Sequence, residues 1–235
     1  MIEKTKNYLS IIKRKFKYKK TSYSYNGVDL IISYIFKNIN KGFYLDIGAQ
    51  HPISNNNTYL LHQKGWKGIN IDLDKKNIDL FKLARPNEIN LNYAVSDING
   101  EAALYFYHDA SPINTLSEEV SKFQKAKVKN VKNIQTKTLN NILQDLNFNS
   151  QINYMNIDVE GHEEKILKGF DIQKYKPNVV SIEYLDLKMK KLEFKNNDIK
   201  NLMNSILYKY FLNNDYYFVN WLHGDLIFIH KDFRD

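Results

Sequence analysis

The chain has 235 residues, 43% of them apolar and 14% aromatic, which is enough to bury one complete α/β core without a partner. It contains no cysteine, which excludes disulfides and thiolate metal sites and suits a reducing compartment. No apolar run approaches the roughly 20 residues of a membrane span, and no signal-type segment opens the sequence. We therefore expect a cytoplasmic protein.

The positive charge gathers near the N-terminus. The formal net charge is +8, and residues 1–20 hold eight lysines and arginines against Glu3 alone, so the other residues contribute only +1. A nucleic-acid-binding protein would spread such an excess over its folded surface, and we expect no nucleic acid as a partner. The sequence predicts a basic arm over residues 1–25 and a single domain over residues 26–235. The arm is either solvated, or in contact through residues 1–20 with a membrane surface or with an acidic partner.

The first part of the domain reads as helix, strand, turn, helix and strand. Apolar residues run almost continuously through Phe43–Ile47, as in a parallel strand covered on both faces, and Gly48 then marks a sharp turn. The other predicted elements are a helix over Asn26–Asn38, a helix that starts near Ser54–Thr58, a strand over Gly68–Leu73 and a helix over Lys75–Leu83.

The second part continues the alternation of strands and helices. Its predicted strands are Ile89–Val95, Ala102–Tyr107, Val128–Thr136, Ile152–Val159, Pro177–Tyr184, Tyr216–Leu222 and Leu226–Ile229, of which the last two form a hairpin. Its predicted helices are one capped by Thr138, one after Gly161 and one over Asn197–Leu212. Residues 108–117 read as a long loop of the kind that often forms a functional lid. This order predicts a doubly wound α/β fold with a mostly parallel sheet that ends in an antiparallel hairpin.

Acidic residues close several of the predicted strands. They are Asp46, Asp72, Asp97, Asp158 with Glu160, and Glu183. In open sheets of this type ligands bind outside the carboxyl ends of the strands, so we expect a small-molecule cleft there. Asp72 follows Asp46 by 26 residues, close to the spacing at which a second strand offers a carboxylate to ribose hydroxyls.

The turn after Gly48 lacks the glycines that cradle phosphates. A dinucleotide fingerprint requires glycine where this chain has Gln50 and Ile53, and no P-loop motif occurs. This disfavours an NAD-dependent oxidoreductase. A nucleoside ligand without phosphate, such as S-adenosylmethionine, tolerates the less glycine-rich turn.

Three stretches together resemble the FkbM-type methyltransferases. They are LDIGA at Leu45–Ala49, NIDVEGHE at Asn156–Glu163 and VVSIEY at Val179–Tyr184, and the resemblance covers roughly residues 40–190. It implies a Rossmann-like class I methyltransferase fold with a mostly parallel seven-stranded sheet and helices on both faces. It also implies S-adenosylmethionine as the methyl donor and, usually, O-methylation of sugars or of hydroxyls on secondary metabolites.

The resemblance also assigns residues to the donor. Asp46 and Gly48 would shape the methionine pocket, Asp72 would hold the ribose, and Ser96 with Asp97 would lie beside the adenine. Further donor contacts are expected at the mouth of the first helix and in the preceding loop, from Asn57, Thr58 and Gln50. This chain departs from the commoner family pattern at Gln50 and Pro52.

The catalytic candidates lie at the end of the predicted strand Ile152–Val159 and just after it. In an extended strand Asp158 and Glu160 would share a face, with His162 just past the turn and Glu183 on the next strand. Asp158 and His162 are the two candidates for the base that takes the acceptor proton, and Glu160 has the alternative role of capping the following helix. A bound metal, if there is one, would be Mg²⁺ or Mn²⁺ on Asp158, Glu160, His162 and Glu183.

The leading hypothesis is a methyltransferase for a sugar or nucleotide-sugar hydroxyl, used for a surface polysaccharide such as capsule or lipopolysaccharide. The richness in lysine, asparagine and isoleucine favours a bacterial source. The alternative is a non-catalytic Rossmann-like binding protein that uses its basic arm on nucleic acid or a membrane surface. The oligomeric state, monomer or homodimer, stays open.

Overall fold

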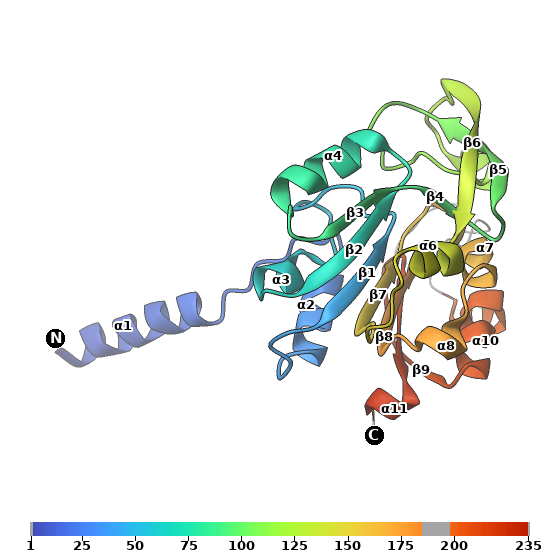
Figure 1. The fold of residues 1–235 in the computed structure, drawn as a ribbon. Coiled ribbons are helices and arrows are strands. Elements are labelled where there is room, and N and C mark those ends of the chain that lie inside the picture. The colour runs from blue at the N-terminus through green and yellow to red at the C-terminus, as the bar shows by residue number, and fades with distance from the viewer. Residues whose placement is uncertain (1, 185–197, 235) are drawn as a thin grey trace.

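A seven-stranded sheet forms the centre of the molecule (Figure 1). The computed structural model describes residues 2–184 and 198–234. The strands follow the order β3-β2-β1-β7-β8-β10-β9, and all pairings are parallel except the two made by β10. Their bounds are β1 (Phe43–Ile47), β2 (Lys67–Asp72), β3 (Ile89–Asn92), β7 (Tyr154–Ile157), β8 (Val179–Glu183), β9 (Tyr216–Leu222) and β10 (Asp225–His230). The predicted mostly parallel sheet with a C-terminal hairpin is confirmed.

Helices cover both faces of this sheet, because side chains along each strand alternate between two apolar clusters. In β1, Tyr44 packs with α2 (Val28–Ile35) and α3 (Tyr59–Gln63). Leu45 belongs to the opposite cluster. That cluster is completed by α6 (Leu139–Asp145), α7 (Glu163–Lys168), α8 (Ile172–Tyr175), α9 (Ile199–Asn204) and α10 (Ile206–Asn213). The predicted three-layer, Rossmann-like architecture is therefore confirmed.

A second, three-stranded sheet lies beside the main one (Figure 1). It consists of β4 (Ala94–Ser96), β6 (Asn130–Thr138) and β5 (Gly100–Phe106), in that order. The prediction of one strand over Ile89–Val95 was wrong, since the chain leaves the edge of the main sheet at Tyr93 and enters the second sheet. The side chains of β4 are buried, and Val95 belongs to the main apolar core, whereas β3 is a half-exposed edge strand.

The predicted helix over Asn197–Leu212 is interrupted. Asn197 lies outside the described residues, and α9 ends before Ser205, whose backbone is extended at ψ 154°. The Ser205 hydroxyl accepts a hydrogen bond from Tyr208 N at 3.2 Å and so caps α10. The remaining described helices are α1 (Ile2–Lys17), α4 (Lys75–Ala84), α5 (Glu118–Phe123) and α11 (Lys231–Arg234).

Helix α1 lies apart from the rest of the fold and is drawn in blue in Figure 1. Its 16 residues correspond to the basic arm expected from the sequence. None of the helices in the described ranges is both long and apolar enough to cross a bilayer.

The turns that follow β1 and β7 touch at Gly48. Its φ of 77° lies in the left-handed region, and a Cβ at this position would lie 1.7 Å from the carbonyl oxygen of Asp158. Only glycine therefore allows the two strand ends to meet.

Gly48→Ala is expected to destabilise the fold more than Gly65→Ala. Gly65 also has a positive φ of 85°, but a Cβ added there would have no other atom within 4 Å. Gly65→Ala should thus lower the free energy of unfolding by about 1–2 kcal/mol through backbone strain alone. Gly48→Ala should cost about 1–3 kcal/mol more through the overlap with Asp158. Urea denaturation measures both, and equal losses would contradict the close contact.

Candidate functional site

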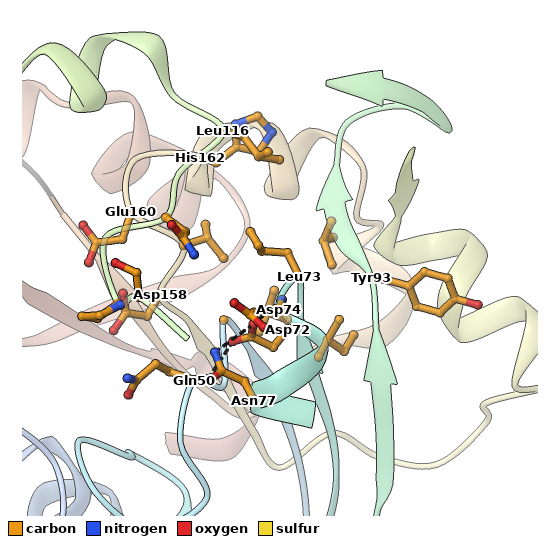
Figure 2. A pocket seen from close by; sticks show the side chains of 18 residues that line it. Gln50, Asp72, Leu73, Asp74, Asn77, Tyr93, Leu116, Asp158, Glu160 and His162 are labelled. Atoms are coloured by element: carbon orange, nitrogen blue, oxygen red, sulfur yellow. Dashed lines mark hydrogen bonds between the residues drawn. The ribbon is translucent and has the colours of Figure 1, made fainter. Parts of the chain in front are cut away.

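Two adjoining cavities open at the carboxyl ends of the strands, where the sequence predicts a cleft. The first encloses about 580 Å³ between β1, β2, the turn after β7 and residues 111–116. Figure 2 shows Asp158 and Glu160 on one side of it and Tyr93 on the other, with Asp72 and Gln50 between them. Its remaining wall is largely apolar and includes Ile47, Ile71, Leu73 and Val95.

The second cavity, of about 1000 Å³, is rich in amide and carboxylate groups. Its lining includes Asn26, residues 55–57, Asn156 and Asp225. Both cavities share part of their lining, namely Gly48, Gln50, Pro112, Asp158 and Glu160. A group held in one cavity can therefore meet a group held in the other beside these two carboxylates.

Asp72 lies in the first cavity, at the end of β2. Its carboxylate accepts hydrogen bonds from Gln50 N at 2.8 Å, Asp74 N at 2.7 Å and Asn77 Nδ2 at 3.2 Å. Burial nevertheless raises its pKa to about 6. These contacts fix the carboxylate against the floor of the cavity and hold the Gln50 turn, where φ is 53°, over it.

Asp46, in contrast, lines the second cavity and is 1% exposed. It accepts hydrogen bonds from Asn156 Nδ2 at 2.9 Å, Thr58 Oγ1 at 2.9 Å and Asn56 Nδ2 at 3.3 Å. Burial raises its pKa, while these bonds act in the opposite direction. Thr58 is fully buried behind it, and Asn57 donates to Asn156 Oδ1 at 3.0 Å and reaches the second cavity. Asp46 therefore joins β1, β7 and the loop between β1 and α3.

Arg85 is a central residue of the site that sequence reasoning missed. It is 1% exposed and donates to Asn56 Oδ1 at 2.8 Å, Thr58 Oγ1 at 2.9 Å and the carbonyl oxygen of Pro52. The Glu88 carboxylate lies 3.9 Å from its guanidinium. In the sequence Arg85 stands before a proline and marks only the end of a helix. Its position under the loop depends on the tertiary fold.

The turn after β7 differs from the predicted extended strand. β7 ends at Ile157, and Glu160 and Gly161 follow with positive φ of 56° and 89°. Glu163 Oε1 accepts Val159 N and Gly161 N, both at 3.1 Å. Glu163 therefore holds the turn that precedes α7 through two of its backbone N–H groups. Strain at a non-glycine residue such as Glu160 is typical of functional sites.

Three of the predicted catalytic carboxylates come together. Oxygen atoms of Asp158, Glu160 and Glu183 all lie within 4.8 Å of one another. Burial, and next to it the neighbouring acids, raise the pKa of Asp158 and of Glu183 well above the usual range. Burial followed by the charge of Glu163 raises the pKa of Glu160 to about 7. Among the described residues, Glu183 Oε2 is buried without a hydrogen-bond partner.

His162 is not part of this group of carboxylates. It lies near Leu116 in Figure 2 and is 4% exposed. Its Nε2 is 2.9 Å from Ser96 Oγ, which in turn donates to Asp97 Oδ1 at 2.9 Å. Burial, together with the charge of Lys165, lowers the pKa of His162 to about 4. Ser96 and Asp97 thus lie behind His162 and are not among the residues that line the first cavity.

A doubly wound sheet with cavities at the carboxyl ends of its strands is typical of a Rossmann-like protein that binds small molecules there. The family model described as "Methyltransferase FkbM domain" matches residues 46–210. The chain therefore belongs to the FkbM methyltransferase family, and the resemblance noted in its sequence is confirmed. No curated protein and no solved structure matches the chain.

Arg85→Met is expected to destabilise the protein by about 3–5 kcal/mol, because it leaves the buried carboxylates of Asp46 and Glu88 without their cation. The exposed Lys82, one turn earlier on α4, is the control, and Lys82→Met should change the free energy of unfolding by less than about 0.5 kcal/mol. Chemical denaturation measures both variants. Equal effects would contradict a structural role for Arg85.

Proposed function

We propose that this methyltransferase transfers a methyl group from S-adenosylmethionine to a hydroxyl of a sugar or nucleotide sugar. One observation carries the proposal. Asp158 and Glu160 line both cavities, so a donor in the first cavity and an acceptor in the second would meet beside carboxylates.

The lining of the first cavity suits the chemistry of the donor. Leu73, Val95 and Tyr93 offer an apolar wall to the adenine ring, and the Asp72 carboxylate suits ribose hydroxyls. Gly48 and Gln50, in the turn after β1, also line this cavity, where the methionine part would lie. Ser111 Oγ, which is buried without a partner among the described residues, is a further polar group in this wall.

When bound, S-adenosylmethionine supplies a methyl group that its sulfonium charge has already activated. The protein has to align the acceptor oxygen and to remove its proton. Alignment contributes much of the rate in well-oriented reactions, and a positioned base contributes about 10²- to 10⁴-fold. When Glu160 is ionised, it also places negative charge beside the cationic donor.

The pair Asp158 and Glu160 is the base that this geometry favours. Glu160, with a pKa near 7, is partly ionised at neutral pH and can accept the proton that the hydroxyl oxygen loses on methylation. His162 reaches only the first cavity, and its lowered pKa makes it a weak base. The Mg²⁺ or Mn²⁺ site stays a prediction, for which Asp158, Glu160 and Glu183 lie together but His162 does not.

The lining of the second cavity supports a sugar as the acceptor. Amides and carboxylates such as Asn57, Asn156 and Asp225 form hydrogen bonds with hydroxyl groups, and Tyr25 adds an aromatic side chain. None of the described residues that line it is a lysine or arginine. We therefore propose that the sugar enters this cavity and that any phosphate of a nucleotide sugar lies outside it. A role in surface polysaccharide synthesis is part of the same proposal.

Asp72→Asn should weaken donor binding by about tenfold or more, because a charged hydrogen-bond acceptor for the ribose is lost. Titration calorimetry with S-adenosylmethionine and with its demethylated product measures this change. Asp79→Asn, at a partly exposed position of α4, is the matched control and should bind as the unmodified chain does. Absence of binding by the unmodified chain would refute the proposed donor.

The methylation rate should increase with pH up to about 7 and then level off. Glu160 must be ionised to act as a base, and its pKa is about 7 because it is buried and lies near the charge of Glu163. Glu160→Gln should lower the rate by about 10²- to 10⁴-fold with unchanged donor affinity. Methyl transfer from labelled donor to a panel of sugars measures the profile.

His162→Gln is the control for this profile. Since His162 is neutral above a pH of about 4, its replacement should leave the ascending limb near pH 7 in place. Loss of this limb in His162→Gln, with its retention in Glu160→Gln, would exclude the carboxylate pair and favour the histidine.

A further inference from the structure

Helix α1 carries an apolar stripe whose two ends, Leu9 and Phe16, are exposed in the described part of the fold. Leu9, Ile12 and Phe16 follow one another at intervals of three and four residues, which places them on one side of a helix. Leu9 is 59% exposed and Phe16 71% exposed. Figure 1 shows the helix pointing away from the sheet and its covering helices.

Basic side chains surround this stripe. Within α1 they are Lys4, Lys6, Lys13, Arg14, Lys15 and Lys17, and Glu3 is the single acid. The whole segment over residues 1–20 has a net charge of +7, while the rest of the chain is close to neutral. The helix therefore presents an apolar face and a strongly cationic face, and it does so on an element separate from the site.

We propose that α1 binds the surface of a bilayer that contains anionic phospholipids. An interfacial helix buries its apolar face at the boundary of the acyl chains and keeps its lysines among the anionic headgroups, so both faces are satisfied at once. Nucleic acid would bind only the cationic side chains and would leave Leu9 and Phe16 exposed to water. A second copy of α1 would cover the stripe but would bring two cationic helices together over about two heptads, which is short for a coiled coil.

The end of the arm is anchored beside the second cavity. The Asp29 carboxylate of α2 accepts hydrogen bonds from Ser22 Oγ and Tyr23 N, both at 2.6 Å. The two residues Tyr25 and Asn26 then line the second cavity, and Asn26 Nδ2 donates to Asp225 Oδ2 at 3.2 Å. A helix bound to a membrane would thus keep the entrance of this cavity near the lipid surface. This inference does not depend on the reaction catalysed.

Vesicle flotation with the full chain tests the proposal. We expect binding to vesicles of phosphatidylcholine with phosphatidylglycerol, loss of binding at high salt, and little binding to pure phosphatidylcholine. Leu9→Gln should weaken vesicle binding by about tenfold, since it replaces an apolar side chain that the bound helix would bury in the bilayer.

Ile11→Gln is the matched control for Leu9→Gln. Ile11 is 65% exposed and lies on the side of α1 opposite Phe16, so the same change in polarity should leave vesicle binding nearly unchanged. Thermal unfolding should be the same for both variants, because α1 lies outside the core. Equal loss in both variants, equal binding to neutral vesicles, or dimerisation through α1 in place of vesicle binding would overturn the proposal.

Discussion

A buried charge network under the loop after β1 is the constraint on which both cavities depend. The Asp46 carboxylate and the Arg85 guanidinium are linked through Asn56 and Thr58, which form hydrogen bonds with both of them. Because an uncompensated buried charge is costly, the loop has to keep this conformation. The loop then presents Gln50 to both cavities and its asparagines to the second one.

The main features of the fold follow from local patterns. Continuous apolar runs at Phe43–Ile47 and Val179–Glu183 identify buried parallel strands, since no other short element requires apolar residues on both faces. The structure differs from the prediction where the sequence pattern does not mark the end of an element. Apolar residues continue through Tyr93 although the chain changes sheets there, and helical spacing continues through Ser205 although its hydroxyl caps a new helix.

The location of the site was predictable because carboxyl ends of parallel strands meet at one edge, which brings Asp72, Asp158 and Glu183 into two adjoining cavities. The environment of each side chain could not be predicted from the sequence. The burial of His162 against Ser96, the backbone contacts of Glu163 and the position of Arg85 all depend on the tertiary fold. Local spacing contains no information about such partners.

The short connection between α1 and the domain keeps the second cavity close to any surface that α1 binds. Four residues, 18–21, separate the helix from Ser22, which hydrogen-bonds to Asp29, so the connection spans at most about 18 Å. A helix held at a surface would confine the second cavity to a thin layer above it, where an acceptor carried on the same surface has a high effective concentration. An acceptor free in solution would gain nothing from this confinement. Helix α1 would thereby select among substrates without touching any of them.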